Sequence, residues 1–360
     1  MMKSVNYLAG SRVFGDLPSE LEWSELEWLR DLPGKNFFGL WLFLNDPDLP
    51  PGYDHYIISY HCEPLDWEWI RRQATRVNGL IIILNDGMPY DNFDLLPNVK
   101  FYTYHSWHFQ MERIHKLWPN ITTKNPKYKV SAINNRVTQS KLIIFTAIME
   151  LIEDQSLVKL SDWIESKNVN WYTKTGFPIL DQLTETFKQK YAGKKIDIDN
   201  FKALFSPQDI NSNPNTVAYT DAALHFSLES YNYSYIEDTY GAYTRAGPHL
   251  SEKTFKCLLA ETAVIPVSQY DVYNQLQQLG FMFDYGPLDL SFDRDPGNLS
   301  RLEKIVELCK TINIYSIDEL LHYTKDSSEH NREHIISGDF AQECIKVNQH
   351  TANNIIAELS

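Results

Sequence analysis

The sequence lacks the paired cysteines, the long apolar runs and the excess of positive charge that mark several large classes of protein. Its four cysteines stand singly, with no Cys-x-x-Cys pair, which favours a reducing, cytosolic compartment. No apolar run approaches the roughly 20 residues that a membrane helix needs, and no secretory signal is expected from the first residues. The formal net charge of −14 argues against a protein that coats phosphate backbones, because such binding depends on Lys and Arg replacing counterions.

Glycine-rich and nucleophile signatures are absent as well. The sequence contains no Walker loop, no G-x-G-x-x-G fingerprint and no G-x-S-x-G elbow. These absences weaken kinase, dehydrogenase and hydrolase interpretations.

Two patterns resemble metal sites, and both have a simpler explanation. Asp46 and Asp48 flank a proline after an apolar run, and this resembles the Asp-x-Asp of metal-dependent GT-A transferases; the proline-rich continuation favours an ordinary turn. His330 and His334 fit the H-x-x-E-H pattern of zinc peptidases. The polar residues around them predict a solvated polar helix instead.

The chain does contain short apolar runs that end in turn residues. With 360 residues, of which 43% are hydrophobic, two α/β domains are expected. In the first third, runs that are apolar on both faces predict strands of a covered parallel sheet. The expected strands are residues 37–44, 56–60, 80–84 and 100–104, and the expected helices are residues 66–78 and 109–118.

The same alternation restarts after the polar, proline-broken linker at residues 124–127. Strands are expected at residues 128–133, 222–228 and 263–267, and helices at residues 140–152, 180–191, 251–260 and 272–279. The chain after residue 299 is mostly helical by pattern. This predicts two Rossmann-like domains, one over residues 1–124 and one over residues 125–310. A helical C-terminal region over residues 311–360 follows.

The most informative segment opens the helix at residues 251–260. Ser251 is a good N-cap, and Glu252, Lys253 and Thr254 lie in the first turn, where free backbone N–H groups favour an anion. A diphosphate placed there would meet Lys253, and Glu252 could accept hydrogen bonds from sugar hydroxyls. An ordinary capped helix explains the same residues equally well on local physics alone.

This segment and the residues after it resemble known proteins. Ser251-Glu252-Lys253, the proline-containing run at residues 264–267 and the helix at residues 272–279 resemble the donor-binding segment of fucosyltransferase-like and exostosin-like GT-B glycosyltransferases. Glu252 to Lys256, Leu279-Gly280-Phe281 and the acidic residues 289–295 are similar to a group of uncharacterised phage and bacterial proteins. The resemblance covers roughly residues 222–311, with a weaker echo at residues 131–141. It implies a GT-B-like fold, in which residues 1–124 form the acceptor domain and residues 125–310 form the nucleotide-sugar domain.

Other candidate site residues follow strands in the same scheme. Glu229 ends an apolar run, and Arg136 follows the first strand of the second domain, where it could grip a donor phosphate. In the similar proteins that turn often carries a His-Arg pair, whereas this chain has Gln139-Ser140-Lys141. The candidate catalytic bases are His61, Glu63 and Asp86, and the sequence ranks none of them above an ordinary loop residue.

Together with these residues, the resemblance implies transfer of a sugar from a nucleotide-diphosphate sugar to an acceptor hydroxyl. Lys253 and Arg136 would neutralise the leaving diphosphate in a positive patch that includes Lys141, and Glu252 and Glu229 would hold donor hydroxyls. No cofactor or divalent metal is expected where protein cations carry that role. The acceptor is either a hydroxymethylated base of phage DNA, which would place the protein in the host cytoplasm, or a glycan, lipid-linked sugar or protein. A non-catalytic nucleotide-sugar-binding protein is the alternative of another class.

Overall fold

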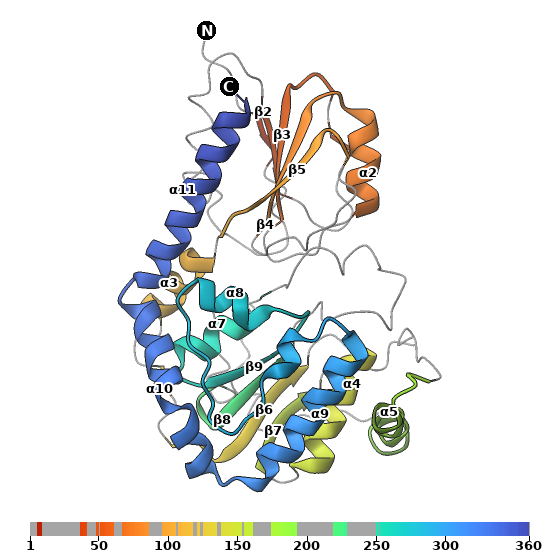
Figure 1. Ribbon diagram of the computed structural model, residues 1–360, viewed down its shortest axis with the longest axis vertical. Coiled ribbons are helices and arrows are strands. Elements are labelled where there is room, and N and C mark those ends of the chain that lie inside the picture. The colour runs from red at the N-terminus through yellow and green to blue at the C-terminus, as the bar shows by residue number, and fades with distance from the viewer. Residues whose placement is uncertain are drawn as a thin grey trace.

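The fold is α/β, with parallel strands in two separate sheets (Figure 1). The computed structural model describes residues 6–8, 37–41, 48–49, 51–60, 67–85, 96–105, 107–117, 121–122, 125–134, 138–152, 155–160, 174–192, 219–228, 250 and 252–359. The first sheet comes from the strands before residue 104 and the second from strands between residues 128 and 267.

The first sheet has its strands in chain order. They are β1 (Asn6–Leu8), β2 (Phe37–Trp41), β3 (His55–Tyr60), β4 (Leu80–Asn85) and β5 (Val99–Thr103), all parallel. Alternate residues of a strand point to opposite faces. Ile81 and Ile83 therefore pack with Trp69 and Ile70 of α2 (Trp67–Arg76) on one face. The opposite face of β4 is also buried, which explains its continuous apolar sequence.

The C-terminal helix α11 (Asp339–Leu359) covers that opposite face. Its Ile355 and Leu359 pack against Ile57, Ile82 and Leu84 of the first sheet. The carboxyl end of the chain is thus part of the core built by the amino-terminal strands, and Figure 1 shows α11 alongside that sheet.

Polar side chains of α11 fix its position beside β5. Asn348 accepts a hydrogen bond from the backbone N of His105 (2.8 Å) and donates one to its carbonyl oxygen (2.9 Å). Thr351 donates to the carbonyl oxygen of Thr103 at 2.7 Å. Backbone groups at the end of β5 and just beyond it therefore gain partners that the sheet itself does not supply.

The second sheet has the order β7-β6-β8-β9. Its strands are β6 (Tyr128–Asn134), β7 (Ser156–Leu160), β8 (Ala222–Leu228) and β9 (Ala263–Val267). One face is covered by α4 (Gln139–Leu151), α5 (Pro178–Lys190) and α9 (Asn298–Ile314). The other is covered by α3 (Trp107–Leu117), α7 (Glu252–Leu259) and α10 (Ile317–Ile336). The short α8 (Val272–Gln278) and the 3-10 turn η7 (Ser291–Arg294) follow β9.

Helix α3 joins the core of the second sheet although it directly follows β5. Trp107, at its start, lies with its ring centroid 5.1 Å from that of Phe255 in α7, and Met111 and Ile114 belong to the same cluster. The chain leaving β5 therefore packs on the second sheet, as α11 packs on the first.

Most expected strands and helices are present, with ends that differ by a few residues. Strands β1 and β7 were not predicted; Lys159 interrupts the apolar pattern of β7, in which Leu157 and Val158 are buried. Among the described residues, no helix has both the length and the apolar character required to cross a membrane.

Candidate functional site

The strand order reverses at β6 in the second sheet. β6 pairs with β7 on one side and with β8 on the other, all in parallel. The chain therefore moves outward in one direction after β6 and then crosses back to the other side. Ligands of open α/β sheets bind outside the carboxyl ends of the strands at such a reversal. The first sheet, in chain order, has no reversal among its described strands, so the geometry singles out the carboxyl ends of β6 and β8.

The first turn of α4 lies at this edge. Thr138 is the N-cap, and its hydroxyl accepts a hydrogen bond from the backbone N of Lys141 at 3.4 Å. Gln139, Ser140 and Lys141 follow, and Lys141 is only 2% exposed. A lysine is rarely so buried. Lys141 is the third residue of α4, in the first turn, and this end of a helix favours an anion.

The first turn of α7 lies at the same edge on the opposite face of the sheet. Thr254 is buried, and its hydroxyl donates to the Ser227 hydroxyl at 3.0 Å, one residue before the end of β8. Lys253 precedes it and is half-buried. The carbonyl of Lys253 accepts the Sγ–H of Cys257 at 3.0 Å. Thr254 therefore joins helix to strand, and this contact holds Lys253 beside the carboxyl end of β8.

The carboxyl end of β9 carries a buried carboxylate that sequence reasoning did not identify. Asp293 of η7 accepts hydrogen bonds from the backbone N of Val272 and of Tyr273, both at 2.9 Å, and so caps α8. Burial raises the pKa of Asp293 to about 6; the two backbone donors oppose the shift, and nearby Asp271 adds to it. Asp271 itself has a left-handed backbone, with φ of 71°.

Arg301 of α9 stabilises the same loops after β9. The residue is 3% exposed, and its guanidinium donates to the carbonyl oxygens of Ser268 (3.2 Å) and Asp295 (2.7 Å). Asp295 in turn pairs with Lys304 at 2.8 Å. The acidic stretch at residues 289–295 was noted only as part of a resemblance; in the structure, its members Asp293 and Asp295 organise the loops after β9.

Several predicted site residues lie outside the residues that the structure describes. These are His61, Glu63, Asp86, Arg136, Glu229 and Ser251. Glu252 is described as the first residue of α7, without its side chain. The structure thus brings Lys253, Thr254 and Lys141 to one edge of the second sheet, and the predicted positive patch stays a prediction.

The structure accounts for Asp48 of the first metal-like pattern and for both histidines of the second, whereas Asp46 lies outside the described residues. The carboxylate of Asp48 forms an ion pair with Arg76 and accepts a hydrogen bond from Gln73 Nε2 at 2.9 Å; these bonds lower its pKa. In α10, the Nε2 atoms of His330 and His334 lie 2.9 and 2.6 Å from the carbonyl oxygens of Gly280 and Leu279.

The expectation of a solvated polar helix at residues 330–334 is met only on its outer face, where His330 and Glu333 are exposed. The inner face of α10 packs on the chain that leaves α8. There the side chain of Asn331, which is 1% exposed, accepts a hydrogen bond from the backbone N of Met282 and donates one to its carbonyl oxygen. Among the described residues, no group of three or more His, Cys, Asp or Glu side chains is placed to hold a metal ion.

Comparison with known proteins adds no assignment. No protein-family model, no curated protein and no solved structure matches the chain.

Proposed function

We propose that the chain is a glycosyltransferase that moves a sugar from a nucleotide-diphosphate sugar to an acceptor hydroxyl. The observation that carries the proposal is the strand reversal at β6, with the first turns of α4 and α7 at the same edge. Lys141 and Lys253 lie in those two turns. A diphosphate needs compensating positive charge in a partly desolvated site, and lysines beside helix N-termini supply it.

The proposed reaction is a substitution at the anomeric carbon of the sugar. The acceptor oxygen bonds to the anomeric carbon of the sugar while the bond from that carbon to the phosphate oxygen breaks. The nucleoside diphosphate leaves with the electron pair, and a base takes the acceptor proton. Lys253 and Lys141, with Arg136, stabilise the negative charge that develops on the leaving diphosphate. Glu252 and Glu229 hold donor hydroxyls.

A GT-B-like arrangement of two Rossmann-like domains is part of the proposal. It is supported by two separate parallel sheets and by α3, which leads from β5 directly to α7. That path directs the carboxyl end of the first sheet toward the second. The candidate bases His61, Glu63 and Asp86 come after β3 and β4 in the sequence and lie outside the described residues.

A panel of nucleotide sugars tests the activity. The purified chain is mixed with UDP-, GDP-, dTDP- and ADP-sugars, and release of nucleoside diphosphate and thermal shifts are measured, with the matching free sugars as controls. We expect one donor class to raise the melting temperature and to be hydrolysed slowly without an acceptor. A thermal shift without hydrolysis, even after hydroxymethylated DNA and glycans are added, would assign a non-catalytic binding protein. If no nucleotide sugar has either effect, the proposal is rejected.

A further inference from the structure

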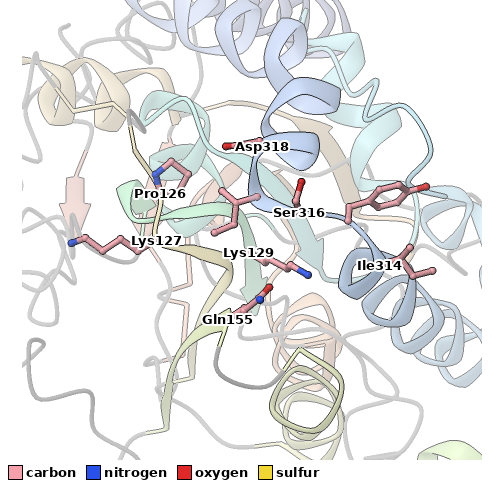
Figure 2. Close-up of a pocket in the computed structure, with 9 residues that line it drawn as sticks. Pro126, Lys127, Lys129, Gln155, Ile314, Ser316 and Asp318 are labelled. Atoms are coloured by element: carbon pink, nitrogen blue, oxygen red, sulfur yellow. The ribbon is translucent and has the colours of Figure 1, made fainter.

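A cavity lies at the amino edge of the second sheet, opposite the strand ends discussed above. Its volume is about 630 Å³, and it is bordered by the beginnings of β6 and β7 and by the connection from α9 to α10 (Figure 2). Its walls include Lys129, Gln155, Ile314, Tyr315, Ile317 and Asp318. Cavities of this size, between about 300 and 1,000 Å³, hold small organic ligands.

A buried lysine forms the polar wall of this cavity. Lys129 is 7% exposed, and its Nζ donates to the carbonyl oxygen of Asn313 at 2.8 Å. An ammonium has three N–H donors, and this is its one hydrogen bond to the described residues. Burial lowers the pKa of Lys129, whereas the Glu319 carboxylate opposes that shift. Two donors and a poorly solvated charge therefore remain for a group inside the cavity.

Another part of the wall is apolar and includes an exposed side chain. Ile314, at the end of α9, is 79% exposed, which is unusual for a large aliphatic side chain, and Ile317 and Pro126 line the same space. Covering these groups removes apolar surface from water, which contributes about 25 cal/mol per Å². The cavity therefore combines a cationic wall with an apolar one.

Carboxylates near the entrance limit the charge of an occupant. Asp318 lines the cavity and is exposed, and Lys127 on the rim already pairs with Asp221 at 3.2 Å. A second negative charge on a ligand would therefore approach Asp318 without a free cation beside it in the described lining.

We propose that this cavity is a second ligand site, which takes a small organic monoanion with an apolar body. The anionic group accepts hydrogen bonds from Lys129 Nζ, and the apolar body covers Ile314 and Ile317. The site is separate from the nucleotide-sugar site, because the two lie at opposite ends of the β6 strand. It also does not depend on the glycosyltransferase proposal.

Two fluorescent probes with the same ring skeleton test the site. Anilinonaphthalene sulfonate carries one negative charge, and phenylnaphthylamine is its neutral counterpart. We expect saturable binding of about one sulfonate probe per chain. Lys129→Met is expected to lower the affinity for the sulfonate probe about tenfold or more, because a charge-assisted hydrogen bond is lost. The affinity for the neutral probe is expected to stay within about twofold of the wild-type value. Lys310→Met, at an exposed position of α9 outside the cavity, is the matched control and is expected to change neither affinity.

Two results would overturn the proposal. One is an unchanged affinity of Lys129→Met for the sulfonate probe. The other is displacement of that probe by a nucleoside diphosphate, which would locate it at the other edge of the sheet. If Lys129→Met does not fold, Ile314→Asp decides, since this exposed position tolerates a charge. This substitution is expected to lower the affinity for the sulfonate probe about tenfold, because the added carboxylate at the rim repels the sulfonate. An unchanged affinity would also reject the site.

Discussion

At the scale of single residues, the carboxyl edge of the second sheet depends on buried polar groups with specific partners. Thr254 is bonded to Ser227, and Asp293 is bonded to the first two N–H groups of α8. Buried polar groups of this kind stabilise a fold because removal of one partner leaves the other without a hydrogen bond. These contacts hold the first turns of α7 and α8 against the strand ends.

Asp293 gives this edge a defined pH dependence. Because burial raises its pKa from 3.8 to about 6, the folded chain holds this proton more tightly than the unfolded chain. Its contribution to the free energy of unfolding therefore falls as pH rises from about 4 to about 6, by up to about 1.4 kcal/mol per pH unit, and is constant above that range.

Asp293→Asn removes the titration and keeps one acceptor for the helix N-terminus. We expect the stability of the wild type relative to Asp293→Asn to decrease between pH 5 and pH 6 by about 1 kcal/mol and to be constant above pH 7. Urea unfolding of both proteins across this range measures the difference. A relative stability that rises with pH would mean that the two N–H donors, rather than burial, control this carboxyl.

At the scale of elements, the sequence pattern predicted the strands that consist of continuous apolar runs. β8 is buried at every residue and β4 at its four central residues, and both were expected. β7 was missed because Lys159 and its short length leave too few periodic residues. The capping of α8 by Asp293 could not be predicted, since about 20 residues separate the partners and no local spacing signals the contact.

The junction of α8 and α10 offers a test of element packing. Gly280 has φ of +92°, and a Cβ there would lie 2.6 Å from the ring of His334, whereas Gly338 has φ of +88° with nothing within 4 Å. Both Gly→Ala substitutions carry the cost of a left-handed backbone, roughly 1 kcal/mol. Gly280→Ala also displaces the His334 ring.

We expect Gly280→Ala to destabilise the fold by about 1–3 kcal/mol more than Gly338→Ala does. Thermal or urea unfolding of the two variants gives this difference directly. His334→Ala in the Gly280→Ala background is expected to reduce the difference. Equal destabilisation by the two single substitutions would contradict the packing of α10 on the end of α8.

At the scale of the whole molecule, each sheet is completed by a helix from the other part of the chain. Helix α3 follows β5 but packs on α7, and α11 follows the helices of the second sheet but covers β4 (Figure 1). The amphipathic pattern of α11 predicts an apolar stripe without identifying its partner. The sequence therefore predicted a helical C-terminal region and could not predict that it closes the core of the first sheet.

Two isoleucines of α11 test this closure. Ile355 is 1% exposed and contacts the first sheet, whereas Ile345 on the same helix is 40% exposed. Ile355→Asp is expected to cost about 3 kcal/mol or more because it buries an unpaired charge, and Ile345→Asp to change stability by less than about 0.5 kcal/mol. Urea unfolding, with limited proteolysis of residues 51–105, compares them. Similar stabilities would contradict the docking of α11 on the first sheet.

The proposed glycosyltransferase binds the donor diphosphate at the first turns of α4 and α7. Calorimetric titration of Lys253→Ala with the nucleoside diphosphate of the preferred donor tests this binding site. Lys346→Ala, at an exposed position of α11, serves as the control. Loss of a charge-assisted hydrogen bond costs on the order of 1.5–3 kcal/mol. Lys253→Ala should therefore bind the nucleotide about tenfold or more weakly with little change in stability, and Lys346→Ala should bind it as the wild type does. An unchanged affinity of Lys253→Ala would contradict the assignment of this edge as the donor site.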